Sequence, residues 1–371
     1  MGLTKIYVAA TSQHVGKTTS TLGLVHVLRE RGFNVGYCKP VGQQFIEVGK
    51  GSRADKDALL FADSMGFELV PELHSPVILG PGATTQYLDN PPQFNYGNRL
   101  LKASKILQQQ HEVVVYEGTG HPGVGSVVNL SNAKVAEMLH TGVIMVVEAG
   151  IGNTIDKLDL NLSVFEQKNI PILGVILNKA IPSKIEKVRH YVGMVLEERG
   201  IELLGILPYE EELGLPVMHT IAREINGSVL VNEHCLNNKV KGIIAGSLID
   251  MQSLSNFDNQ LLVVSIKRLS EALKRIEKVS MRLDTDESPL SGIVVTGEGE
   301  MTPEQMEYFD THQIPVLRVH IDTYEVVIKI SRIEVKINTR TPWKVKKAVE
   351  LFREHVNVDS IMEKLATAPE V

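Results

Sequence analysis

Residues 8–19 read Val8-Ala9-Ala10-Thr11-Ser12-Gln13-His14-Val15-Gly16-Lys17-Thr18-Thr19. The apolar segment Lys5–Ala10 predicts a strand that runs into this turn, and residues 17–31 predict a helix that leaves it. This is the setting in which Gly-Lys-Thr forms a phosphate-binding loop. Backbone N–H groups at the helix start point into one concavity, where the helix dipole favours anions. The stretch therefore predicts a site for the phosphates of a nucleotide.

The residues of this loop have distinct expected roles. Lys17 would reach the β- and γ-phosphates, and the Thr18 hydroxyl would hold Mg²⁺. Thr11 stands five residues before Gly16, where a glycine is usual. The alternative interpretation is an ordinary strand–turn–helix connection that happens to contain Gly-Lys-Thr. The residues expected to contact the nucleotide are Gln13, His14, Val15, Gly16, Lys17, Thr18 and Thr19.

Length and composition limit the possible classes of protein. A chain of 371 residues should hold about two domains, and 43% hydrophobic residues suffice for buried cores. The net charge of -6 argues against nucleic acid as a partner, because phosphate backbones require a basic surface. No apolar run approaches the length of a membrane span, and the N-terminus reads as a strand, not a secretion signal. Two distant cysteines, Cys38 and Cys235, favour a reduced, cytoplasmic setting.

The order of predicted elements indicates an α/β fold. Strands alternate with helices of ten or more residues, which predicts a mostly parallel sheet with helical crossovers. Residues 42–56 read as loop and residues 71–90 as irregular. A polar, Asn-rich stretch at 226–238 predicts a domain boundary. The expected domains are a P-loop domain over 1–228, a second, smaller α/β domain over 239–342, and a C-terminal helical segment over 343–371.

Chemically active residues gather where the predicted strands end. Ligands of open parallel sheets bind outside the carboxyl ends of the strands. A lysine there, such as Lys39, suits an anionic substrate or a developing negative charge, although a solvated lysine at a loop start is the alternative. Glu117 precedes Gly-Thr-Gly and fits a carboxylate bound to metal or substrate, or else a simple turn. Asn178 would meet an adenine edge or cap a turn, and His121 would be a catalyst or a structural hydrogen-bonding residue.

A magnesium site is expected beside the phosphate loop. Mg²⁺ keeps several waters and takes one or two carboxylates together with phosphates. Thr18, Asp57 and Glu117 would supply that set. Asp55 and Asp57 have an alternative role as residues at a helix start, which the helix dipole favours.

These motifs resemble those of dethiobiotin synthetase and the related cobyrinic acid a,c-diamide synthases, which are P-loop ligases that use ATP and Mg²⁺. The resemblance covers about residues 1–225. Its motifs, in order, are Thr11 to Thr18, Lys39-Pro40-Val41, Asp57-Ala58-Leu59, Glu117-Gly118-Thr119-Gly120, Asn178-Lys179 and Gly205-Ile206-Leu207-Pro208.

A second resemblance spans nearly the whole chain. The run from Glu117 to Val127 and the sequence Asp322-Thr323-Tyr324 are similar to the N-terminal region of long bacterial phosphate acetyltransferases. In those proteins a DRTGG domain follows the P-loop domain, and residues 239–340 resemble it. The motif differs here: Ser265-Ile266-Lys267-Arg268 replaces the usual Gly-Asp-Arg, and Thr296-Gly297-Glu298 replaces Thr-Gly-Gly. The acetyltransferase domain itself is not present in these 371 residues.

The resemblance implies roles for individual residues. The loop amides, Lys17 and Thr18 would bind ATP, Asn178 would read adenine, and Lys39 would face a carbamate and the transferred phosphate. Lys17, Lys39 and Glu117 would form the catalytic set, and a homodimer is implied. The residue that contacts substrate after Lys-Pro-Val is a Ser or Thr in the family, whereas Gly42-Gln43 stands here. Diaminopelargonate is therefore not the expected substrate.

Three functions are compatible with these observations. The first is an ATP-dependent ligase or ATPase that activates a small carboxylate as an acyl phosphate. The second is a nucleotide-binding regulatory protein that makes no bond to a substrate. The third, a small-metabolite kinase, is disfavoured because no Arg-rich lid is visible.

Overall fold

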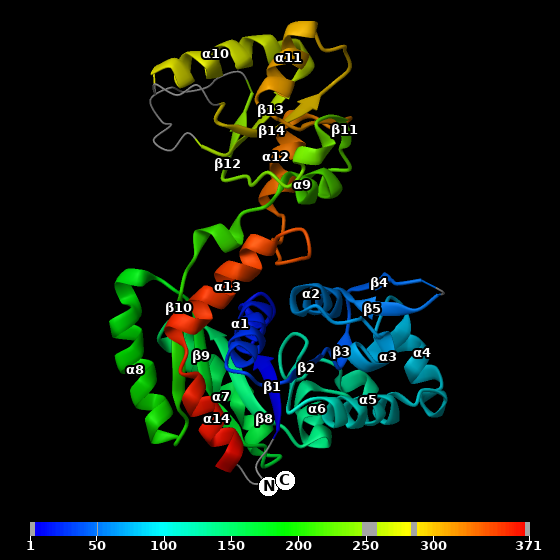
Figure 1. The fold of residues 1–371 in the computed structure, drawn as a ribbon, viewed down its shortest axis with the longest axis vertical. Coiled ribbons are helices and arrows are strands. Elements are labelled where there is room, and N and C mark those ends of the chain that lie inside the picture. Colours follow the sequence, from blue (N-terminus) through cyan, green and yellow to red (C-terminus); the bar gives the residue numbers. More distant parts are fainter. Residues whose placement is uncertain (1–3, 50, 247–257, 283–287, 368–371) are drawn as a thin grey trace. The chain divides into compact units, whose positions relative to one another are not determined.

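The computed structural model describes residues 4–49, 51–246, 258–282 and 288–367. The chain divides into two compact units (Figure 1). The first unit comprises Met1–Glu210 and Ile337–Val371, and the second comprises Glu211–Lys336. Neither of the two cysteines forms a disulfide. Among the described residues, no helix is both long enough and apolar enough to cross a membrane.

A six-stranded sheet forms the centre of the first unit, with strand order β10-β9-β8-β1-β7-β2. Every neighbouring pair is parallel, which confirms the predicted α/β fold. The inner strands are buried on both faces, as their continuous apolar sequences predict. The strands are β1 (Lys5–Ala10), β2 (Val35–Cys38), β7 (Val113–Glu117), β8 (Gly142–Glu148), β9 (Ile172–Ala180) and β10 (Leu203–Pro208).

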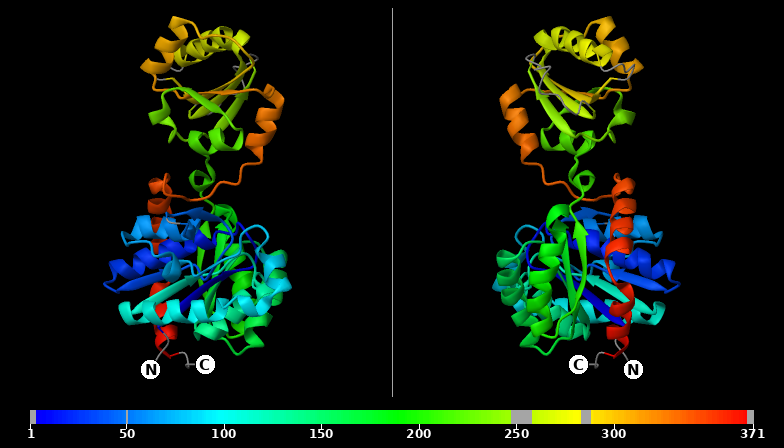
Figure 2. Two further views of the ribbon diagram at one scale, coloured as in Figure 1. Left: turned by 90° about the vertical axis from the view of Figure 1, so that its right-hand side faces the viewer. Right: turned by 90° about the vertical axis from the view of Figure 1, so that its left-hand side faces the viewer.

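Helices cover both faces of this sheet. One face shares a continuous hydrophobic cluster with four helices, α5 (Tyr96–Gln110), α6 (Asn132–Leu139), α7 (Gly152–Glu166) and α8 (Ile185–Glu198). Helix α1 (Lys17–Glu30) packs against α13 (Pro342–His355), and α14 (Val358–Thr367) contacts β9 and β10. Figures 1 and 2 show α13 and α14, in red, running alongside this sheet.

The C-terminal helices belong to the first unit and do not form the separate segment over 343–371 that the sequence predicts. The ring of Phe352 fills the space beside Gly23 of α1, and Phe352 is fully buried. Arg353 of α13 pairs with Glu30 at 2.6 Å. The return of the chain after residue 336 cannot be read from local patterns, because it depends on contacts between residues more than 300 positions apart.

The segments between β2 and α5 are more ordered than the sequence analysis predicts. Two pairs of very short strands occur there: β3 (Val41–Gly42) with β6 (Val77–Ile78), and β4 (Phe45–Glu47) with β5 (Arg53–Asp55). The helices α2 (Lys56–Met65), α3 (Pro71–His74) and α4 (Ala83–Asp89) complete this region. Strands of two or three residues are too short to show a period-two pattern, so residues 42–56 and 71–90 read as loop.

The second unit is built on a five-stranded sheet with the order β11-β15-β14-β13-β12. Four strands are parallel: β12 (Gly242–Ala245), β13 (Gln260–Ser265), β14 (Leu290–Thr296) and β15 (Val316–Val319). The fifth strand, β11 (Ser228–Val231), pairs antiparallel with β15. The helices are α9 (Met218–Glu224), α10 (Leu269–Arg282), α11 (Pro303–Thr311) and α12 (Thr323–Ser331).

The Asn-rich stretch at 226–238 is consequently not a linker. It contains β11, and Asn232 donates its side-chain amide to the backbone oxygens of Phe309 and Ile314. Asn238 likewise donates its side-chain amide to the backbone oxygens of Ser291 and Gln313, so both residues hydrogen-bond within a folded edge. The two units divide after Glu210, so α9 and β11 belong to the second unit and not to the P-loop domain.

Candidate functional site

The phosphate loop connects β1 to α1 and contains two residues with a left-handed backbone conformation. His14 has a φ of 60° and Gly16 a φ of 95°, and both values lie in the left-handed region. No side chain caps the start of α1, so its first N–H groups are not satisfied by a capping residue. Such N–H groups form an anion site.

Asn178 lies directly against this loop. Its side-chain amide donates to the backbone oxygen of Val15 at 2.8 Å, and Asn178 is buried. A Cβ added to Gly16 would fall 1.8 Å from the Asn178 Nδ2, so only glycine fits there. The amide of Asn178 thus positions the loop, and its expected contact with adenine stays a prediction.

Lys39, Glu117, Thr18 and Asp57 form one hydrogen-bonded network. The ammonium group of Lys39 donates to Asp57 Oδ2 at 2.7 Å, to Glu117 Oε1 at 3.1 Å and to the backbone oxygen of Gly118 at 3.0 Å. The Thr18 hydroxyl donates to the same Oε1 of Glu117 at 2.7 Å. The structure therefore brings together four of the residues that the sequence analysis selects for catalysis and metal binding.

Sheet topology explains why these residues meet. The strand β7 lies between β1 and β2, and both pairs are parallel. Glu117 ends β7, Lys39 directly follows β2, and Thr18 follows the turn after β1. The carboxyl ends of three adjacent strands thus place their side chains at one edge of the sheet.

Burial makes this network strongly electrostatic. The Glu117 side chain is 0% exposed, and that of Lys39 is 5% exposed. Burial alone would lower the pKa of Lys39, but the nearby carboxylates of Asp57 and Glu117 raise it above its ordinary value. The Tyr37 hydroxyl donates to Glu117 Oε2 at 3.1 Å. Lysine, tyrosine and threonine donors thus compensate for removing the Glu117 carboxylate from water.

Asp55 has a structural role in this arrangement. Its carboxylate caps α2 by accepting from the N–H of Asp57 at 2.9 Å, which is the helix-start role weighed for it above. It also accepts from the N–H groups of Gln43 and Gln44. A Cβ on Gly42 would fall 2.5 Å from Asp55 Oδ2. This close approach disfavours a side chain at position 42.

Three polar residues of the site, Tyr7, Tyr37 and Asn132, are not predicted from the sequence. Asn132 accepts hydrogen bonds from the Tyr7 hydroxyl and the Thr119 N–H, and donates to the backbone oxygens of Thr119 and His121. It therefore fixes the loop after Glu117. The ring of Tyr37 stacks on that of Phe61 of α2 at 3.7 Å, which holds α2 against β2. For Tyr7 and Tyr37 the sequence signal is a tyrosine inside an apolar strand, and Asn132 stands at the start of α6.

The donor set fits a magnesium ion that also binds phosphate. Within the described ranges, no group of three or more His, Cys, Asp or Glu side chains is arranged to hold a metal by itself. Thr18, Glu117 and Asp57 offer one hydroxyl and two carboxylates around a single lysine. Such a set suits Mg²⁺, which completes its shell with phosphate oxygens and water. His121 is exposed and accepts from the Gly123 N–H, outside this network.

Two family models match the chain. Residues 4–217 match the family model AAA_26, described as an AAA domain. The chain belongs to the AAA_26 family. Residues 220–333 of this AAA_26 protein match the model of the DRTGG domain. Both matches confirm the resemblance drawn from the motifs.

Several curated proteins are similar to this AAA_26 chain. Phosphate acetyltransferase from Nitratidesulfovibrio vulgaris is 22% identical, over 97% of this chain and 51% of that protein. Cobyric acid synthase from Carboxydothermus hydrogenoformans is 27% identical, over 58% of this chain and 47% of that protein. ATP-dependent dethiobiotin synthetase BioD from Anaeromyxobacter dehalogenans is 25% identical, over 56% of this chain and 91% of that protein. The chain thus spans about half the length of the phosphate acetyltransferase.

Proposed function

We propose that this protein binds ATP with Mg²⁺ at the phosphate loop and transfers the γ-phosphoryl group to an oxygen of a small carboxylate or carbamate. The observation that carries the proposal is the buried Lys39, placed between two carboxylates and next to the phosphate-loop residue Thr18. The similarity to ATP-dependent dethiobiotin synthetase supports the same reaction class.

The transfer joins two anions and therefore needs positive charge between them. The acid oxygen would attack the γ-phosphorus, the bond from that phosphorus to the bridging oxygen would break, and ADP would leave with that oxygen. The product is an acyl phosphate where the acceptor is a carboxylate and a carbamoyl phosphate where it is a carbamate. Lys17 on one side and Lys39 on the other would neutralise charge as the acid approaches. Mg²⁺, held by Thr18, Asp57 and Glu117, would neutralise charge on the phosphates.

Lys39 can take part only if its present contacts are exchanged. All three N–H groups of its ammonium donate to protein oxygens, two of them to Asp57 and Glu117. If those carboxylates turn toward a cation, two donors of Lys39 become available for an acid oxygen. We infer that nucleotide and metal binding activates Lys39 in this way.

Acid-dependent release of ADP tests the proposal. The purified full chain is incubated with ATP and Mg²⁺, alone and with each member of a panel of small carboxylic and amino acids, with or without bicarbonate. One or more acids should raise the rate of ADP release well above a slow basal rate, and hydroxylamine should trap the acyl phosphate as a hydroxamate. ADP release that no acid stimulates would contradict the ligase proposal.

A second function is favoured by the extent of the match to phosphate acetyltransferase, which covers 97% of this chain. In this alternative the P-loop unit binds nucleotide and acts as a regulatory module without transferring phosphate to an acid. It predicts ATP binding with no acid-stimulated turnover. The same panel distinguishes the two functions, because only the ligase responds to an acid.

A further inference from the structure

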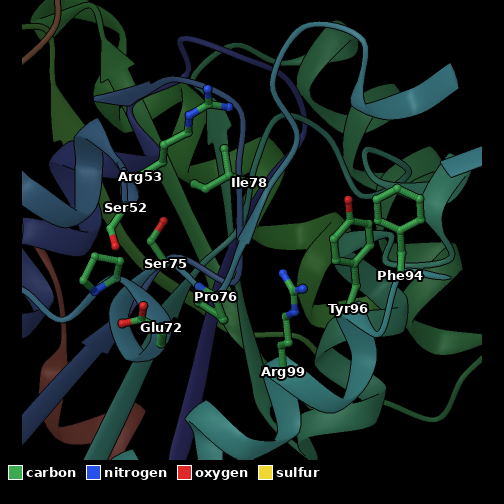
Figure 3. Close-up of a pocket in the computed structure, with 10 residues that line it drawn as sticks. Ser52, Arg53, Glu72, Ser75, Pro76, Ile78, Phe94, Tyr96 and Arg99 are labelled. Atoms are coloured by element: carbon green, nitrogen blue, oxygen red, sulfur yellow. The ribbon is translucent and has the colours of Figure 1, made fainter. Parts of the chain in front are cut away.

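A pocket of about 320 Å³ lies in the first unit, among the short elements between β4 and α5. Figure 3 shows its lining side chains, which come from β5, β6, α3, the start of α5 and the turns beside these elements. None of them belongs to the phosphate loop or to the Lys39 network. They are Ser52, Arg53, Pro71, Glu72, Ser75, Pro76, Ile78, Phe94, Tyr96 and Arg99.

The charges that line the pocket favour an anion. Two arginines, Arg53 and Arg99, face one acid, Glu72. Arg99 lies with its guanidinium carbon 5.9 Å from the centre of the Tyr96 ring, and among the described residues it has no ion pair. Arg53 stacks on Phe45 at 4.6 Å, and its guanidinium group lies 4.0 Å from the carboxylate of Glu47. Both guanidinium groups therefore keep donors for a ligand.

The rest of the wall suits a partly apolar molecule. Ile78, Pro76 and Phe94 line the pocket with carbon, and Phe94 lies 5.3 Å from the Tyr96 ring. The Ser75 hydroxyl accepts from the N–H of Asp55 at 2.9 Å, and no described residue accepts its proton. The pocket thus combines polar groups with apolar surface, as small-molecule sites do.

We propose that this pocket binds a small organic acid. Arg99 and Arg53 bind its acidic groups from different sides of the pocket, and Ile78, Pro76 and Phe94 contact its apolar body. Charge-assisted hydrogen bonds from two guanidinium groups would supply most of the affinity. The assignment does not depend on the proposed function, because it uses no residue of the nucleotide site.

The pocket is also connected to the nucleotide site by short hydrogen-bonded paths. Ser75 bonds to Asp55, whose carboxylate caps the helix that carries Asp57. The backbone oxygen of His74 accepts from the N–H of Lys39 at 2.8 Å. A ligand that orders residues 74–78 would therefore act on both partners of the Lys39–Asp57 pair. We therefore expect that binding of the acid in this pocket also changes the affinity of the protein for the nucleotide.

Isothermal titration on the nucleotide-free full chain tests the assignment. The probes are phenylacetate, adipate and succinate, and the neutral phenylacetamide serves as the charge control. At least one acid should bind saturably, phenylacetamide should not, and Arg99→Gln and Arg53→Gln should each weaken the acid by about tenfold or more. Arg189→Gln, which removes an exposed arginine on α8, is the matched control and should leave affinity unchanged.

Three results would overturn the assignment. They are no saturable binding of any probe acid, unchanged affinity in both pocket variants, and loss of acid binding in Lys17→Ala with retention in Arg99→Gln. The last result would place the acid at the phosphate loop. Because the titration contains no nucleotide, a negative result does not bear on acid-stimulated ADP release. The proposed pocket and the proposed function can therefore be rejected independently of each other.

Discussion

The ammonium group of Lys39 lies 3.1 Å from Oε1 of Glu117, the same oxygen that accepts the Thr18 hydroxyl at 2.7 Å. One fully buried carboxylate thus joins the phosphate loop to the lysine at the neighbouring strand end. A ligand that draws Glu117 away must change the surroundings of both Lys39 and Thr18. The predictions about the site follow from this shared oxygen.

Replacing Lys17 by alanine should weaken ATP binding. Lys17 begins α1 directly after the left-handed Gly16, where a lysine reaches nucleotide phosphates. Loss of a charge-assisted contact should cost roughly 1.5–3 kcal/mol of binding free energy. Isothermal titration of the variant measures this loss, and Lys102→Ala on the exposed side of α5 is the control. Equal affinity of the wild type and Lys17→Ala for ATP would contradict the assignment of this turn as a phosphate-binding loop.

Neutralising either carboxylate of the network should raise the Mg²⁺ requirement. The variants Asp57→Asn and Glu117→Gln keep the shape of the side chain but remove the negative charge that a divalent ion needs. Each should increase the Mg²⁺ concentration for half-maximal ATP turnover by about tenfold, the effect of losing one charged contact of ~1.5 kcal/mol. Asp63→Asn, an exposed position on the same helix as Asp57, should not.

These two variants also remove partners of a buried ammonium group, so their folding must be checked. Breaking a buried ion pair costs about 3–5 kcal/mol in unfolding free energy. The single tryptophan, Trp343, starts α13 in the first unit, and its fluorescence reports unfolding of that unit. If both variants fold and neither changes the Mg²⁺ requirement, Asp57 and Glu117 are not metal ligands.

The first unit should lose stability between about pH 6.5 and pH 4 in a manner that depends on His74. Burial lowers the pKa of His74 to about 4, and its Nδ1 accepts from the N–H of Val70 at 3.0 Å. The folded state binds fewer protons than the unfolded state in this window. The stabilisation is therefore complete above about pH 6.5 and is lost as the pH falls toward 4.

The variant His74→Asn isolates this effect, because an amide oxygen can accept from Val70 but does not titrate. The unfolding free energy of the wild type should fall by about 2 kcal/mol more than that of the variant over the same pH range. His190→Asn, on the exposed side of α8, should retain the pH dependence of the wild type. Identical pH profiles of wild type and His74→Asn would show that His74 does not contribute.

Packing of the C-terminal helix against α1 should make Gly23→Ala destabilising. A Cβ at Gly23 would lie 2.1 Å from the Cβ of Phe352. Overpacking of this kind costs about 1–3 kcal/mol. Gly193 of α8 has no heavy atom within 4 Å of an added Cβ, so Gly193→Ala should instead stabilise its helix by about 0.5–1 kcal/mol. Urea unfolding followed through Trp343 compares them, and equal stability of both variants would contradict the packing.

Much of the fold could be predicted because its signals are local. The apolar runs that form β1, β7 and β8 are buried strands, and the helices between them have clear periods. Three features could not be predicted in this way. The strands β3 to β6 are too short to show a period, β11 lies within a polar stretch, and the return of α13 to α1 depends on distant contacts.

Site residues can be predicted from the sequence where the chemistry requires a particular residue type near the carboxyl end of a strand. Lys39, Asp57 and Glu117 are predicted as catalytic or metal-binding residues for this reason. The structure brings the two carboxylates together around the ammonium group of Lys39. Their expected roles in catalysis and metal binding stay predictions. Tyr7, Tyr37 and Asn132 cannot be predicted in this way, because a tyrosine in a strand and an asparagine at a helix start usually have only structural roles.

The most direct test of the account compares wild type with Lys39→Ala in two assays. Acid-stimulated ADP release should fall to the basal rate in the variant, whereas the affinity for ATP should stay within about twofold, because Lys39 acts mainly in the transition state. Lys39→Ala leaves Asp57 and Glu117 without their common partner, so Trp343 fluorescence first establishes that the variant is folded. Rapid ATP hydrolysis without any acid, at equal rates in wild type and Lys39→Ala, would contradict the proposed mechanism.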